Sequence, residues 1–207
     1  RFLCLMNIAI ALTWQASYDE AIIWNDRALQ AAREISPLAQ TSVLAVRADT
    51  LLEAGRVDES EAAIRQSDAI AGTLRSHDRD LLEILRAHLA SLRGAHAEAL
   101  DAYGRVLTQA ELAADQSAIH VAVISLLRAL ARAGREREML ETAGIARSLA
   151  DEWSKHGFEV PAPFNDPEPA VTAALERLGP EGEAIFQTGH SIEPSQRVKR
   201  LCALIYA

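Results

Sequence analysis

A period of 39 or 40 residues is the feature that most restricts how this chain can fold. Four stretches align at that spacing: QASYDEAIIWNDRAL, EAGRVDESEAAIRQS, LRGAHAEALDAYGRVL and RAGREREMLETAGIA. Each has a small residue at the same place, namely Ala16, Gly55, Gly94 and Gly134. A fixed period of this length is typical of solenoid proteins, in which each repeat buries its apolar face against its neighbours.

Each repeat has the pattern of two helices joined by a tight turn. Apolar residues recur at three- and four-residue spacing on both sides of the small residue, as in amphipathic helices. A glycine just after the first helix suits a left-handed C-cap, and no segment shows the alternating pattern of a β-strand. We therefore predict an all-α fold in which residues 1–154 form four helical hairpins, at about 2–35, 37–74, 79–113 and 116–154.

Other small residues follow the same period and carry a resemblance to a known family. The chain has Tyr18-Asp19-Glu20-Ala21 at the start of a second helix, and three further columns: Ala9, Ala48, Ala87 and Leu127; Ala21, Ser60, Ala99 and Met139; Ala28, Ser67, Val106 and Ala146. This pattern resembles the tetratricopeptide repeat (TPR) over residues 2 to 154. It departs from that family in its period, which exceeds the usual 34 or so residues, and in its single, displaced closing proline, Pro37. The resemblance implies a right-handed superhelical α-solenoid whose first helices line a concave face.

The segment after the repeats has a different composition. Six of the seven prolines fall between residues 161 and 194, and the pattern predicts a proline-rich loop at 155–166 followed by capping helices at 167–207. A solenoid needs such a cap, because its last repeat would otherwise expose an apolar face. Seven apolar residues could cover that face: Leu175, Leu178, Ile185, Phe186, Val198, Leu201 and Leu204.

The tail also resembles the end of the repeat region in large bacterial transcription regulators of the LuxR type and related predicted ATPases. The matching features are Leu178-Gly179, Phe186, Gly189 and the final helix RVKRLCALIYA, whereas the Pro180-Glu181-Gly182 insertion and the basic RVKR depart from the pattern. The resemblance implies a cytoplasmic bacterial protein in which an ATPase module and a DNA-binding helix-turn-helix lie outside this segment. The chain has no GxxxxGK[ST] motif of its own.

Composition and motifs argue against catalysis, metal binding and nucleic-acid binding by this chain. Its net charge of −8 does not suit direct binding of nucleic acid. The six histidines form no close metal-ligand pair, no GxSxG motif occurs, and Cys4 and Cys202 lie at opposite ends. No apolar run is long enough for a membrane span. We expect no enzyme activity, cofactor or metal, and no membrane association.

The TPR resemblance assigns two columns of each first helix to the concave face. One column reads Ile10, Asp49, His88 and Arg128, and the other reads Trp14, Glu53, Leu92 and Arg132. The candidate binding residues are Trp14, Asp49, Glu53, His88, Arg128 and Arg132. They predict a groove, acidic at one end and basic at the other, for a protein or peptide of complementary charge. The alternative is that these side chains point to water or pair with each other. Arg47 and Arg86 share another column and are expected to brace adjacent repeats.

The opening stretch RFLCLMNIAIALTWQAS permits two interpretations. A basic start, an apolar run and small residues are typical of a secretory signal peptide. However, the stretch stays in register with the 39-residue period, which favours the first helix of a repeat. Because it is apolar on all sides, we expect Phe2, Leu3, Met6 and Ile10 to pack against an upstream domain of the same chain.

These observations predict a non-catalytic binding or scaffold module, the sensor or protein-interaction part of a bacterial transcription regulator. Two alternatives stay open. The chain could be a stand-alone TPR adaptor with a fixed protein partner, or an accessory domain of an enzyme.

Overall fold

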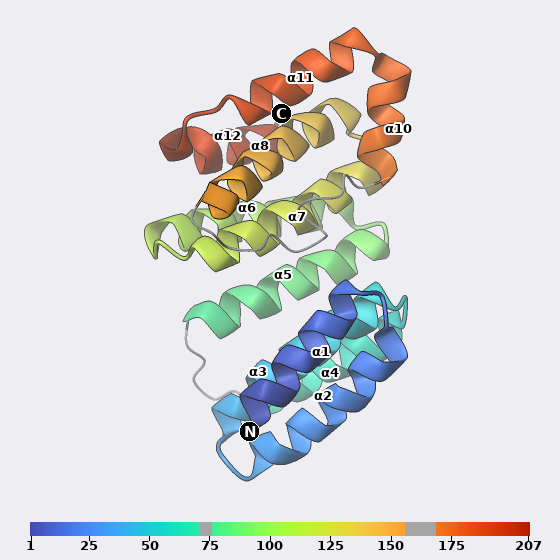
Figure 1. The fold of residues 1–207 in the computed structure, drawn as a ribbon, viewed down its shortest axis with the longest axis vertical. Coiled ribbons are helices and arrows are strands. Elements are labelled where there is room, and N and C mark those ends of the chain that lie inside the picture. The colour runs from blue at the N-terminus through green and yellow to red at the C-terminus, as the bar shows by residue number, and fades with distance from the viewer. Residues whose placement is uncertain (71–75, 156–168) are drawn as a thin grey trace. The chain divides into compact units, whose positions relative to one another are not determined.

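The computed structural model describes residues 1–70, 76–155 and 169–207, and all regular structure in these ranges is helical (Figure 1). The chain divides into two compact units, Arg1–Leu89 and Ala90–Ala207, which we call unit 1 and unit 2. The predicted all-α solenoid of hairpins with a C-terminal helical cap is confirmed. Its right-handed superhelical course across both units stays a prediction.

Unit 1 consists of two helical hairpins and most of a further helix. Its helices are α1 (Phe2–Trp14), α2 (Tyr18–Arg33), α3 (Pro37–Glu53), α4 (Val57–Ile70) and α5 (Ser76–Leu92), which extends past the unit boundary. The helix α2 packs on both α1 and α3, and α3 packs on α4 (Figure 1). The core between α2 and α3 includes Ala28, Leu29 and Leu44, and Phe2 and Met6 of α1 pack against it.

Unit 2 contains the second helix of the third hairpin, the complete fourth hairpin and the tail. Its helices are α6 (His96–Leu112), α7 (Gln116–Arg132), α8 (Glu136–Lys155), α10 (Pro169–Leu178), α11 (Pro180–His190) and α12 (Arg197–Ile205), with a 3₁₀ turn at Pro194–Gln196. In this unit α7 packs on α6 and α8, α11 lies along α8, and α12 packs on α6 and α8. The tail therefore covers the last hairpin, with Val198, Leu201 and Leu204 buried.

The predicted turn positions have a common backbone geometry. Ala16, Gly55, Gly94 and Gly134 all have positive φ, between 56° and 82°. The residue after each one donates its N–H to the carbonyl five residues earlier, as in Ser17 to Leu12 at 2.9 Å and Arg56 to Leu51 at 2.8 Å. This is the Schellman arrangement of a helix C-terminus. Glycine adopts it without strain, whereas Ala16 adopts it with a Cβ in place.

The columns of small residues lie where helices approach each other. In unit 1 Ala9, Ala21, Ala28 and Ala48 are fully buried. Ser60 of α4 donates a hydrogen bond to the carbonyl of Ala48 in α3 at 2.8 Å, which brings the two helices of one hairpin into close contact. The burial expected for these columns is confirmed.

Some expectations differ from the structure or lie outside the residues it describes. Phe2 and Met6 face the core of unit 1 rather than outward, because a helix that is apolar all round gives no signal for its inner side. The helix α5 begins at Ser76, earlier than the expected start at 79. The end of the second predicted hairpin (71–74) and the start of the predicted capping helices (167–168) lie outside the described residues, as does the predicted loop at 155–166 except Lys155, which ends α8.

Candidate functional site

The acidic half of the predicted groove belongs to unit 1. Asp49 and Glu53 lie one turn apart on α3, both half-buried, and each already takes part in an interaction within the chain. Trp14 ends α1, which packs on α3, and 49% of this residue is exposed. Trp14 and Glu53 thus occupy equivalent positions on neighbouring first helices, with Asp49 one turn before Glu53, a combination that suits apolar and basic side chains.

His88 has a different environment from the other acidic-half candidates. It lies on α5, is buried, and interacts within the chain. A buried imidazole of this kind contributes to packing, so a partner at the surface reaches Trp14 more readily than His88.

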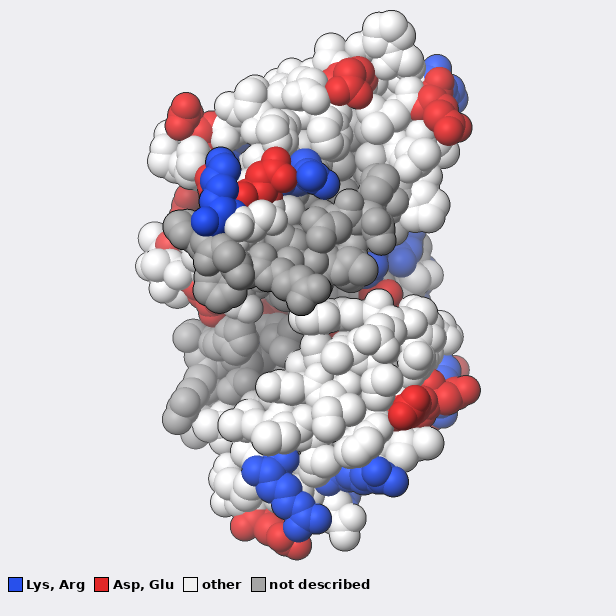
Figure 2. All heavy atoms as spheres, in the orientation of Figure 1, with Lys and Arg blue, Asp and Glu red and all other residues white. Residues whose placement is uncertain are grey.

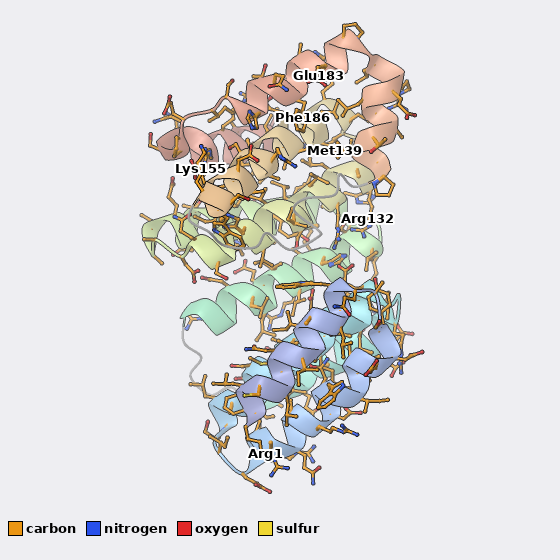
Figure 3. All side chains as sticks on the ribbon, viewed as in Figure 1. Arg1, Arg132, Met139, Lys155, Glu183 and Phe186 are labelled. Atoms are coloured by element: carbon orange, nitrogen blue, oxygen red, sulfur yellow. The ribbon has the colours of Figure 1, made fainter. Side chains whose placement is uncertain are left out.

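The basic half of the predicted groove belongs to unit 2. Arg128 and Arg132 lie one turn apart on α7, with Arg128 half-buried and Arg132 exposed at the end of the helix (labelled in Figure 3). Both interact within the chain. The assembly of all six residues into one groove stays a prediction, because its acidic and basic halves belong to different units.

The expected bracing by Arg47 and Arg86 is confirmed. Arg47 of α3 pairs with Asp26 of α2 at 3.4 Å, and Arg86 of α5 pairs with Asp68 of α4. Each arginine therefore reaches the second helix of the preceding hairpin. Such partly exposed ion pairs each contribute at most about 1 kcal/mol to the free energy of unfolding. Their main effect is to favour one alignment of neighbouring hairpins over others.

A buried polar cluster between α1, α2 and α3 was missed by the sequence reasoning. The hydroxyls of Thr13 and Thr50 lie 2.8 Å apart, and the side-chain amide of Asn25 donates to Thr50 at 3.1 Å. The sequence signal was three uncharged polar residues at positions where amphipathic helices usually carry apolar ones. The cluster joins the first three helices. If one of these helices shifted along the others, the hydrogen bonds would be lost and buried polar groups left unpaired, so the cluster favours the observed alignment.

The final helix α12 is held to α8 by the RVKR stretch. Arg197 donates two hydrogen bonds to the carboxylate of Glu152, at 2.8 and 2.9 Å, and Arg200 donates to both oxygens of Glu141. The hydrogen bonds from Arg197 hold the pKa of Glu152 below its usual range, and the bond to Glu141 raises the pKa of Arg200. Two of the basic residues that depart from the regulator tail pattern are therefore used inside the chain.

Arg135 fixes the other end of α12. Its guanidinium donates to the carbonyls of Leu204 and Ile205, at 2.7 and 2.9 Å, and also to Glu138. Burial raises the pKa of Glu138, but the hydrogen bonds from Arg135 and from the residue's own backbone, together with the charges of Arg135 and Arg137, outweigh it and hold the pKa below its ordinary value. A cation on the last carbonyls of a helix also interacts favourably with the helix dipole.

The helix α11 approaches α8 at two glycines. A Cβ on Gly144 would lie 2.0 Å from the carbonyl oxygen of Phe186 (labelled in Figure 3), and a Cβ on Gly189 would lie 2.0 Å from that of Glu141. Real Cβ atoms do not come so close, so no other residue fits at either position with the helices in place. Nearby, His190 pairs with Asp151 at 2.9 Å, and this hydrogen bond lowers the pKa of the Asp151 carboxyl.

The described residues also bear on metal binding and on membrane insertion. Among residues 1–70, 76–155 and 169–207, no three His, Cys, Asp or Glu side chains are grouped as they would be around a metal ion. In the same ranges, no helix combines the length and apolarity that a membrane crossing requires.

Comparison with known proteins gives a structural likeness. No family model matches the chain, and no curated protein matches it. Two crystal structures of a putative kinesin light chain with nearly identical TPR-like repeats from Podosopora anserina, one of them of a point variant, are similar to it. For each, the TM-score is 0.52 at 17% sequence identity, and the match covers 100% of this chain and 95% of the other. The chain therefore has the fold of TPR-like repeats.

Proposed function

We propose that this chain is a non-catalytic protein-interaction module that binds a peptide or helix of another protein along its first helices. The observation that supports the proposal is that Trp14 is half exposed at the end of α1, while Asp49 and Glu53 lie one turn apart and half-buried on α3, the helix that α1 packs on. An exposed aromatic residue on one helix and two carboxylates on the next offer both an apolar contact and complementary charge. Its ligand in unit 1 is a segment with basic and apolar side chains, and the Arg128 and Arg132 pair in unit 2 receives acidic ones.

The binding proposal is tested with immobilised chain and a displayed library of random peptides. The native chain selects peptides rich in Lys, Arg and apolar residues, and Asp49→Lys with Glu53→Lys abolishes that enrichment. A matched control changes two exposed acids of unit 1, Glu20→Lys with Glu34→Lys, which alters the net charge equally and leaves selection intact. Equal loss in both variants would show non-specific charge attraction, and unchanged selection in the first would overturn the proposal.

Reversal of the basic pair tests the second half of the groove. The native chain also selects acidic peptides, and the variant Arg128→Glu with Arg132→Glu loses that selection while it retains the selection of basic peptides by unit 1. If the selection of acidic peptides is unchanged by this variant, the role proposed for the two arginines is refuted.

We further propose that the module is the sensor part of a larger cytoplasmic bacterial transcription regulator, with an upstream domain of the same chain as one of its partners. The support is the resemblance of the tail, Leu178-Gly179, Phe186 and Gly189. Binding of an effector protein to the first helices would then shift how the module packs on the domain that acts on DNA. The complete coding frame provides the test. A GxxxxGK[ST] motif and a helix-turn-helix in the same polypeptide support a regulator, and a frame without them supports a stand-alone adaptor.

A further inference from the structure

Residues 151–153, near the C-terminal end of α8, are each held by a different helix. The first accepts a hydrogen bond from His190 of α11 at 2.9 Å, and the second accepts two from Arg197 of α12. The third, Trp153, stacks on His120 of α7, with the ring centroids 4.1 Å apart and the planes inclined by 24°. Three neighbouring helices are therefore attached to this one turn of α8.

The imidazole of His120 lies in the interior of unit 2. Only 3% of this residue is exposed. Its Nδ1 lies 2.6 Å from the carbonyl oxygen of Gln116, one turn earlier in α7, so Nδ1 carries the hydrogen. Burial lowers the pKa of His120 below its ordinary value of 6.5, although the backbone groups of Gln116 and Leu149 act in the opposite direction. The fold therefore favours the neutral imidazole.

Two charged groups from α8 and α12 also act on His120. The carboxylate of Glu152 raises the pKa of His120, and the guanidinium of Arg197 lowers it. These two groups are hydrogen-bonded to each other at 2.8 and 2.9 Å, so the carboxylate already has a cation as its partner. A proton on His120 would therefore place a second positive charge beside an acid that is neutralised by the first.

Other charged groups on the helices around His120 have partners of their own. Asp115, the N-cap of α7, accepts a backbone N–H of its own helix at 3.0 Å. On α8, Asp151 pairs with Arg147 at 3.0 Å, and Lys155 is exposed at the end of the helix. The buried residues of α6, which also packs on α7, include no charged side chain. Figure 2 shows charged side chains of both signs gathered over the end of α8. A proton on His120 thus gains no new counter-charge from these acids.

We propose that His120 is a proton-sensitive contact that holds the C-terminal end of α8, residues 149–155, against α7 when neutral and loosens it when protonated. The neutral ring stacks on Trp153 and donates to the carbonyl of Gln116. A charged imidazole is solvated better by water than by this buried site, and it reaches water when the end of α8 moves away from α7. This proposal does not depend on the binding groove described above.

The direction of the pH dependence follows from the direction of the pKa shift. The pKa of His120 is lower in the folded chain than its ordinary value of 6.5, so the opened chain takes up the proton more readily. The contact therefore stabilises the end of α8 fully above that value, and this stabilisation is lost as the pH falls from there through the folded pKa. His190 acts in the opposite sense, because a proton on it adds charge attraction to its hydrogen bond with Asp151.

The fluorescence of Trp153 reports on this contact. In a background of Trp14→Phe with Trp24→Phe, Trp153 is the remaining tryptophan. Its emission moves to longer wavelength as the pH is lowered from about 8 to about 5, because the indole ring gains water. The variant His120→Gln keeps a hydrogen-bond donor but takes up no proton in this range, and it removes the dependence. His190→Gln is the matched control at the same end of α8, and it keeps the dependence.

Hydrogen exchange measures the loosening without any change to the tryptophans. Protection factors, which correct for the intrinsic effect of pH on exchange, are determined for the amides of residues 149–155 at about pH 7.5 and about pH 5.5. The native chain loses protection at these amides on acidification, and His120→Gln retains it. The amides of α3 in unit 1 are the internal reference, and their protection changes equally in both proteins.

Several results would overturn the proposal. One is equal loss of protection in the native chain and in His120→Gln. Another is protection that increases on acidification, which would mean that attraction between the imidazolium and the indole outweighs burial. A third is emission of Trp153 that does not respond to pH in the native histidine background. If circular dichroism shows that His120→Gln is unfolded, His120→Phe replaces it, because phenylalanine keeps a ring beside Trp153 and takes up no proton.

Discussion

The contact between α8 and α11 gives a sharp test of how the tail is attached to the last hairpin. Gly189 lies where a Cβ would be 2.0 Å from the carbonyl oxygen of Glu141. A carbon–oxygen contact of that kind needs about 3.3 Å. In Gly189→Ala the two helices must separate by about 1 Å at this point, and close-packed side chains on both sides lose contact.

The size of the effect follows from two opposing contributions. Alanine in place of glycine within a helix normally stabilises it by about 1 kcal/mol. Overpacking against a backbone atom costs roughly 1–3 kcal/mol and exceeds this gain where neither side can yield. We therefore expect Gly189→Ala to lower the free energy of unfolding of unit 2 by up to about 2 kcal/mol. Urea denaturation followed by circular dichroism and by tryptophan fluorescence measures it.

Gly104→Ala is the matched control, because it is also a helical glycine of unit 2. There the added Cβ would lie 2.9 Å from the hydroxyl of Tyr206, the far end of an exposed side chain that can move. This variant keeps or raises the native stability. Gly144→Ala opens the same helix contact as Gly189→Ala, so the double variant loses less than the sum of the two single losses. If Gly189→Ala is as stable as Gly104→Ala, the close backbone contact is refuted.

Two further predictions concern the helix ends and the dependence of stability on pH. Ala16→Gly raises the free energy of unfolding and Gly55→Ala lowers it, by roughly 1 kcal/mol each, because both positions have positive φ and no atom crowds a Cβ on Gly55. Urea denaturation measures both changes, and equal stabilities for the two variants and the native chain would contradict the strain argument. The pKa of Glu152 is lower in the folded than in the unfolded chain, because Arg197 donates hydrogen bonds to its carboxylate. The pair therefore stabilises the fold fully at a pH above the unfolded pKa of 4.5, and this stabilisation is lost as the pH falls through the folded pKa. The urea midpoint of the native chain therefore falls between pH 7 and acid pH, and it falls less in Glu152→Gln. Glu193→Gln, which changes an exposed acid, is the control and behaves as the native chain does. If the midpoint of Glu152→Gln falls as much as the native one, the pair does not contribute to stability.

The period of the sequence predicted the structural features that recur in every repeat. Left-handed turns at Gly55 and Gly134, and buried alanines at Ala9 and Ala48, follow from spacing alone, because every repeat meets the same requirement. The bracing role of Arg47 was also within reach of the pattern, since its column lies beside the preceding hairpin in each repeat.

Contacts that occur once could not be predicted in this way. Arg197 and Arg200 bind acids 45 and 59 residues earlier, and nothing in the period relates the tail to α8. Gly189 matched a tail pattern, but that pattern did not tell that this residue of α11 serves the close approach to α8. The six predicted groove residues illustrate the same limit, because equivalence of position does not tell that His88 is buried while Asp49 and Arg128 of the same column are only half-buried.

The last hairpin and the first present the same physical problem and differ in how it is met. A repeat helix that is apolar on both sides must be covered on both. At α8 the chain supplies the cover itself: glycines let α11 approach at backbone distance, and three arginines, one just before α8 and two in α12, fix the final helix by charge-assisted hydrogen bonds. At α1 Phe2 and Met6 pack against the core of α2 and α3, and the hydroxyls of Thr13 and Thr50 lie within hydrogen-bond distance. The last hairpin is thus held mainly by close backbone contact and charge-assisted hydrogen bonds, and the first by apolar packing around a buried polar cluster.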